Sequence, residues 1–111
     1  MNIINTNKTD LSKREIYALT RGQTISLKDV ENGAEITPDV WVLYTDVNSK
    51  GNEVEILAVK DVTGAVFSTN SPTFKDEFAY IAELMSGEQY DIRVVKRESK
   101  ANRTFITCEL V

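Results

Sequence analysis

Five basic side chains and a phenylalanine are concentrated near the C-terminal end of this chain. Of the 13 Lys and Arg residues among 111, five fall between Arg93 and Arg103, and Phe105 follows. Guanidinium and ammonium groups hold phosphates, and an exposed aromatic ring stacks on an unpaired base. These residue types therefore indicate a surface for single-stranded nucleic acid. The candidate residues of this surface are Arg93, Arg97, Lys100, Arg103 and Phe105.

The segment that carries these residues has the pattern of a β-hairpin. Residues 90–98 (YDIRVVKRE) and 103–110 (RTFITCEL) alternate between apolar and polar side chains across a short polar turn. If the aliphatic positions and Cys108 face the core, Leu110 included, then the arginines and Phe105 face outward. An edge hairpin kept soluble by its charges, with Phe105 packed on an N-terminal helix, would show the same pattern. The pattern alone leaves both interpretations open.

Upstream of the hairpin, three strand-like runs precede one helix. The runs cover 39–47, 53–60 and 65–69. The order of three strands, a helix and two strands is that of an OB-fold. We therefore expect a mainly β protein with an OB-fold-like five-stranded barrel, one helix after strand 3 and a short N-terminal helix. Residues 1–111 are expected to form one domain, with residues 1–10 as a flexible arm.

Capping signals locate the two helices. Ser12 and Glu15 form a capping-box pattern, and Gly22 is a natural end for the helix they begin. Ser71 and the proline after it start the second helix. An apolar stripe follows at helical spacing: Phe74, Phe78, Ile81 and Met85.

Two loops and two strand aromatics extend the candidate interface. In an OB-fold, the loop between the first two strands and the loop between the last two flank the binding face. Here those loops contain Lys50 and Lys100. Trp41 and Tyr44 lie on the first barrel strand, where core packing is the default role of an aromatic ring. Either ring could also serve as a stacking platform, and alternation does not say which.

The net charge is −4, but the charges are unevenly distributed. Residues 1–28 sum to +3 and residues 89–111 to +2, while residues 29–59 sum to −6 and residues 60–88 to −3. With a Debye length of about 8 Å, a ligand responds to the nearby face more than to the distant total. An acidic protein with basic strips at its ends is compatible with nucleic-acid binding.

Several function classes find no support in the composition. The chain has no histidine, one cysteine and no glycine-rich phosphate loop, so we expect no enzyme activity, metal or cofactor. Cys108 lies in an apolar alternation and is expected to be a buried hydrophobe. No apolar run is long enough to cross a bilayer, and the N-terminus lacks a signal-peptide pattern. We expect a soluble cytoplasmic protein.

Four segments, in order along the chain, resemble small single-stranded DNA-binding proteins of phages and prophages, of the type that serves protein-primed replication. The segments are REIYALT at 14–20, WVLYTDVNSKG at 41–51, VFSTNSPTF at 66–74 and SKANRTFITCELV at 99–111. The resemblance implies an OB-like barrel that coats single-stranded DNA in phage replication or recombination. It also implies little sequence preference, no catalysis and a place in the host cytoplasm. The matching positions are Lys50, Lys100, Arg103 and Phe105.

Partners on this interpretation are single-stranded DNA and replication proteins, and both monomer and dimer stay open. Two alternatives also stay open. The acidic middle, residues 29–55, could be a DNA-mimicking or partner-docking surface for a basic protein. The chain could instead be an accessory subunit of a replication complex that binds DNA only weakly.

Overall fold

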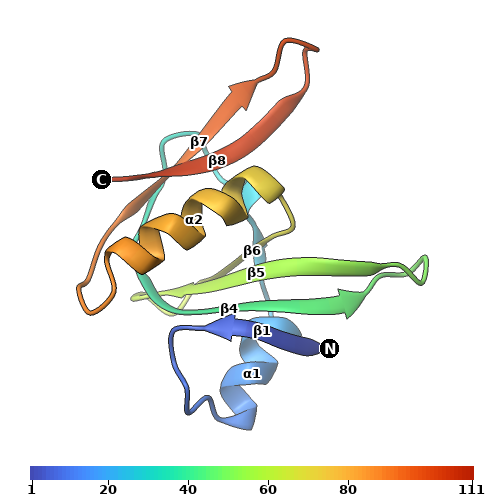
Figure 1. The fold of residues 1–111 in the computed structure, drawn as a ribbon, viewed down its shortest axis with the longest axis vertical. Coiled ribbons are helices and arrows are strands. Elements are labelled where there is room, and N and C mark those ends of the chain that lie inside the picture. The colour runs from blue at the N-terminus through green and yellow to red at the C-terminus, as the bar shows by residue number, and fades with distance from the viewer.

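Eight strands, two α-helices and one short 3-10 helix make up the computed structural model, which describes residues 1–111 (Figure 1). In chain order the elements are β1 (Asn2–Thr6), α1 (Lys13–Thr20), β2 (Ile25–Ser26), η1 (Leu27–Asp29), β3 (Glu35–Ile36), β4 (Pro38–Val47), β5 (Glu53–Asp61), β6 (Val66–Thr69), α2 (Pro72–Leu84), β7 (Ile92–Glu98) and β8 (Thr104–Leu110). The protein is therefore mainly β, as the sequence predicts.

The larger sheet has the order β1-β4-β5-β6-β2. Its central ladder pairs β4 with β5 from Pro38 and Asp61 to Val47 and Glu53. Side chains on the two faces of β4 enter two different cores, because successive residues of a strand point to opposite sides. Both faces of this strand are covered, as its apolar sequence predicts.

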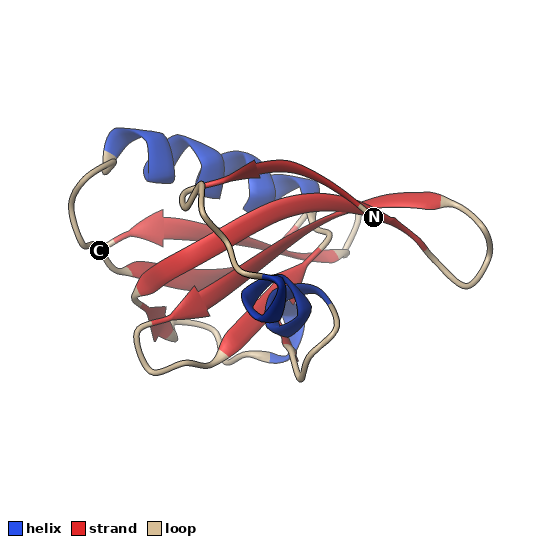
Figure 2. Ribbon diagram, turned by 90° about the horizontal axis from the view of Figure 1, so that it is seen from below, coloured by secondary structure: helices blue, strands red, loops and turns tan.

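The smaller sheet has the order β3-β7-β8. Only Thr37 separates β3 from β4, so one nearly continuous segment contributes a strand to each sheet. The Thr37 hydroxyl donates a hydrogen bond to the Asp91 carboxylate just before β7. The continuity of β3 with β4 and this hydrogen bond attach the base of the β7–β8 hairpin to the larger sheet. Figure 2 shows the strands with the long helix α2 on one side of them and the short helix α1 on the other.

The two sheets do not close into a barrel, although a barrel was expected. Closure would require β6 to pair with β8, but the second edge of β6 is occupied by β2, in parallel register from Ile25 and Phe67. The following η1 turn contacts both β6 and β8 and buries Leu27 in the core. Ser71 and Thr73 hydroxyls also donate to the Ile106 carbonyl on β8. Residues 25–29 therefore occupy the position in which β6 and β8 would pair in a closed barrel.

Residues 2–6 form a strand rather than part of a flexible arm. They pair with β4 from Asn2 and Thr45 to Thr6 and Val42, with one irregularity after Ile3. The Thr6 hydroxyl donates to the Trp41 carbonyl at 2.8 Å, and Asn7 accepts from the Trp41 amide at 2.9 Å. These long-range bonds hold a segment whose own sequence has no strand periodicity.

Both helices begin where their caps predict and cover opposite sides of the larger sheet. The Ser12 side chain accepts from the Glu15 amide, and the Glu15 carboxylate accepts from the Ser12 amide. Helix α1 places Leu19 over one face. Helix α2 places Phe74, Phe78 and Ile81 over the other, where they meet the inner side of β7–β8.

Cys108 is buried beneath α2, as expected. Burial raises the pKa of its thiol to about 12, with a smaller contribution from the Glu77 carboxylate. The thiol therefore stays protonated at neutral pH and packs as a small apolar group. Neither α-helix has the length and apolar character that crossing a membrane would need.

Candidate nucleic-acid interface

The β7–β8 hairpin has one side in the core and one side outside it. Ile92 and Val94 are fully buried, and Ile106 and Cys108 nearly so. These positions confirm the predicted inward side. Leu110 was also expected inside, but it is 38% exposed because the strand ends there.

The opposite side of the hairpin, which we call the outer face, carries three cross-strand pairs. Arg93 lies opposite Glu109, Val95 opposite Thr107, and Arg97 opposite Phe105. The Ser99 amide bonds the Arg103 carbonyl at 2.8 Å, which fixes Arg97 and Phe105, two residues further in, as a hydrogen-bonded pair of the ladder. The Cα atoms of such a pair stand about 5.5 Å apart. A cationic side chain and a half-buried aromatic ring therefore emerge side by side.

A defined turn carries two more cations at the end of the hairpin. The Asn102 amide bonds the Ser99 carbonyl at 3.0 Å, and the Arg103 amide bonds the Ser99 hydroxyl at 3.3 Å. Asn102 has a φ of 56°, a left-handed conformation that asparagine tolerates better than most residues. Lys100 and Arg103 are exposed beside it. Figure 1 shows this turn projecting beyond the rest of the molecule.

Uncompensated positive charge is concentrated at this tip. Lys96, Arg97, Lys100 and Arg103 make no ion pair, and Glu98 is the only acidic residue between positions 96 and 103. The local charge is therefore +3 on a protein of net charge −4. Because screening limits the reach of distant carboxylates, an anion near the tip meets a positive potential.

Arg93 was expected to face nucleic acid, but its guanidinium is already paired with two carboxylates. Its guanidinium binds Glu109 Oε1 at 3.1 Å and Glu35 Oε2 at 3.4 Å. Hydrogen bonds to Glu109 and then Glu35 raise the pKa of the arginine above its usual value. Two carboxylates from neighbouring strands satisfy this group, so it joins β3, β7 and β8 instead of facing a ligand.

The two strand aromatics also differ from the expected interface. Tyr44 is only 4% exposed and packs on the α1 side, so its ring cannot stack on a base. Burial, with a smaller effect of Asp46, raises the pKa of its phenol. Trp41 lies on the other face and is half-buried, with its ring 5.7 Å from Phe78 in an edge-to-face contact. Neither ring is near the β7–β8 turn.

Lys50 is exposed, but it lies on a separate projection. Asn48 Oδ1 accepts from the amides of Lys50 and Asn52, both at 3.0 Å, and shapes the β4–β5 turn. Figure 1 shows this turn and the β7–β8 turn as two tips that stand apart. The structure therefore brings together Arg97, Lys100, Arg103 and Phe105, and leaves Lys50 outside the group.

Sequence reasoning overlooked Lys96 and Thr107. Lys96 lies in register with the buried Ile106, yet it is only half-buried and unpaired because the core ends there. Thr107 adds a hydroxyl to the outer face next to Phe105. The same alternation that selected Phe105 would have selected Thr107.

Comparisons of the chain with protein-family models, curated proteins and solved structures find no match. No relative therefore indicates which exposed side chains have a function, and the resemblance to phage proteins stays a prediction. The geometry of the β7–β8 hairpin is the observation on which a functional proposal can be based.

Proposed function

We propose that this protein binds single-stranded DNA with little sequence preference, in phage DNA replication or recombination. The supporting observation is the outer-face pair of Arg97 and Phe105, with Lys100 and Arg103 beside it and no carboxylate paired to any of the three cations. Such a combination suits an unpaired strand, whose bases and phosphates are reachable together.

In this proposal each side chain has a distinct role. Phe105 stacks on one base, which needs no particular sequence because every base has an aromatic face. Arg97, Lys100 and Arg103 hold successive phosphates along the hairpin. Each contact releases condensed counterions, so affinity falls as salt rises. No catalytic group or cofactor enters this function, and its place would be the cytoplasm of the host cell.

The arrangement of the strands supports an OB-like assignment within the same proposal. The run β4-β5-β6, helix α2 and the hairpin β7–β8 follow one another as OB-fold elements do, and β3, which leads into β4, pairs with β7. The missing link is the pairing of β6 with β8, where β2 is inserted. We propose an open OB-like fold in which the last hairpin is the binding element.

A titration with oligothymidine tests this function. Fluorescence anisotropy at low ionic strength should show saturable binding by the wild-type protein, and Arg103→Ala with Phe105→Ala should weaken it at least tenfold. Lys28→Ala removes an exposed cation on η1 and should leave the affinity within twofold. If the wild-type protein does not bind oligothymidine, the proposed function is wrong. If the double variant binds as tightly as the wild type, the interface is wrong.

A further inference from the structure

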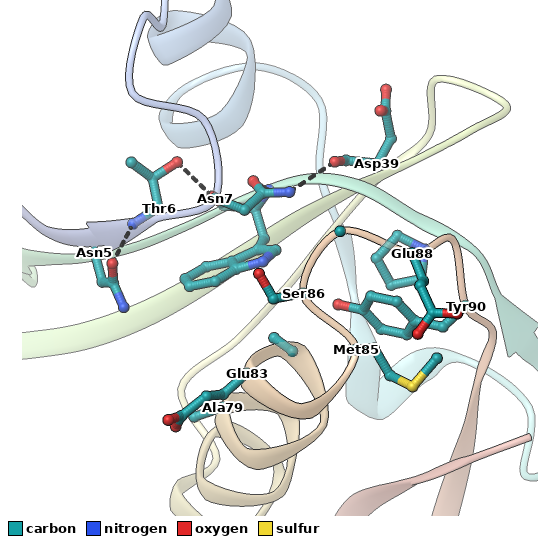
Figure 3. Close-up of a pocket in the computed structure, with 14 residues that line it drawn as sticks. Asn5, Thr6, Asn7, Asp39, Ala79, Glu83, Met85, Ser86, Glu88 and Tyr90 are labelled. Carbon is teal, nitrogen blue, oxygen red and sulfur yellow. Dashed lines mark hydrogen bonds between the residues drawn. The ribbon is translucent and has the colours of Figure 1, made fainter.

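A groove of about 580 Å³ lies between the β1–β4 edge and the C-terminal end of α2 (Figure 3). Residues 5–7, residues 38–41 and the segment from Ala79 to Tyr90 contribute to its walls. In Figure 1 this end of α2 is on the left, whereas the β7–β8 turn is at the top right. The groove is therefore separate from the proposed DNA interface.

The walls of this groove are negatively charged. Glu83 and Glu88 line it, and no lysine or arginine does. Glu83 and Glu88 are exposed and make no ion pair. The Asp39 backbone borders the groove, but its carboxylate points away from it in Figure 3 and lies 3.8 Å from the Lys60 ammonium. A phosphate backbone would be repelled from such a surface, and a cation would be attracted.

The end of helix α2 adds to this potential. The helix ends at Leu84, its last turn has no basic residue, and Met85, Ser86 and Glu88 continue along the groove. The carbonyl end of a helix carries a partial negative charge that favours nearby cations. The chain leaves that charge without a cation of its own.

Aromatic groups and a fixed rim complete the site. Trp41 and Tyr90 both line the groove, and burial raises the pKa of Tyr90 to about 12, so its phenol stays neutral. A tryptophan face attracts guanidinium and ammonium groups. The Asn7 side chain donates to the Asp39 carbonyl and accepts from the Trp41 amide, both at 2.9 Å, which fastens β1 to β4 along this edge.

We propose that this groove is a docking site for a segment of a partner protein that bears arginine or lysine. One cationic side chain would lie between Glu83 and Trp41 and a second one near Glu88, both close to the end of α2. The negative charge of the groove favours a basic protein segment and repels the phosphates of DNA, which the β7–β8 turn would bind. The two sites could then be occupied together, and the groove proposal does not depend on DNA binding.

Trp41 is the only tryptophan, so its fluorescence reports on this groove directly. A hexa-arginine peptide should change the Trp41 emission in a saturable manner. Glu83→Gln with Glu88→Gln should weaken this binding at least fivefold. The matched control, Glu31→Gln with Glu53→Gln, removes two exposed carboxylates elsewhere and should leave it within twofold.

The hairpin variant Arg103→Ala with Phe105→Ala separates the two proposals, because it should lose oligothymidine and retain hexa-arginine binding. An unchanged Trp41 emission would overturn the docking site. Equal weakening by the groove variant and its control would also overturn it, since only general attraction to an acidic protein would then be at work.

Discussion

Arg97 and Phe105 face each other across the β7–β8 ladder, on the side of the hairpin turned away from the core. The inner side of the hairpin, with Ile92, Val94, Ile106 and Cys108 buried, fixes the direction of both side chains because strand residues alternate between faces. A buried inner side thus positions a cation and an aromatic ring for an external ligand.

The salt dependence of oligothymidine binding should report the number of phosphate contacts. With Arg97, Lys100 and Arg103 as three contacts, the slope of log K against log salt should be about −2, at roughly −0.7 per contact for a single strand. Affinity would then fall about twentyfold between 50 and 200 mM salt. Anisotropy titrations at several salt concentrations measure this. A flat response would show that phosphate contacts do not drive binding.

Substitutions of Phe105 should separate stacking from general apolar contact. Stacking on a base contributes about 1–3 kcal/mol, so Phe105→Ala should weaken binding by about 5- to 150-fold. Phe105→Tyr retains the ring and should bind within about threefold of wild type, whereas Phe105→Leu should behave like the alanine variant. Thermal unfolding checks that the fold is intact. Equal affinities for Leu and Tyr would exclude a stacking role.

Arg93→Ala should behave differently from the other arginine variants. Because Glu109 and Glu35 already hold this guanidinium, its loss should change oligothymidine affinity less than twofold. The effect should appear as a lower midpoint of thermal unfolding, since three strands lose a common partner. Arg97→Ala is the matched comparison and should show the reverse pattern. A large loss of DNA affinity in Arg93→Ala would mean that the ion pairs open on binding.

Much of this fold could be predicted from local sequence, and much of the site could not. Ser71 and the Phe74–Phe78 spacing define α2, and alternation defines the inner side of the last hairpin. Pairings between distant segments left no local signal. Examples are β1 on β4, the insertion of β2 beside β6, and the Glu35 partner of Arg93, which is 58 residues away.

The pattern of β4 illustrates the same limit. Val42 and Tyr44 alternate with Trp41 and Leu43, and both sets are apolar, so the sequence could not say which ring would be more deeply covered. Tyr44 lies within the buried cluster that includes Leu19 of α1, whereas Trp41 only borders the core under α2. The groove beside Trp41 could not be predicted from the sequence either, because three segments far apart in the chain form it.

The capping box of α1 should give the stability of the protein a measurable pH dependence. The Lys8 ammonium and then the Ser12 amide lower the pKa of Glu15 to about 2. A carboxylate in the unfolded chain titrates near 4.3, so the stabilisation is present above that pH and is lost as pH falls toward 2. The difference in unfolding free energy between wild type and Glu15→Gln should therefore shrink over this range.

Urea unfolding at pH 7, 5, 4 and 3 measures that difference. Glu31→Gln removes an exposed carboxylate that makes no ion pair and serves as the control. A wild-type advantage over Glu15→Gln that stays constant from pH 7 to pH 3 would contradict the assigned role of the Lys8–Glu15 contact.

The most direct test of the DNA interface is a nitrogen–proton correlation NMR titration of the intact protein with oligothymidine at low ionic strength. Saturable shifts are expected for the amides of Arg97, Lys100, Arg103, Phe105 and Thr107, with little change around Trp41 and Glu83. Shifts centred on the groove beside Trp41, or no shifts at any protein-to-DNA ratio, would contradict this interface.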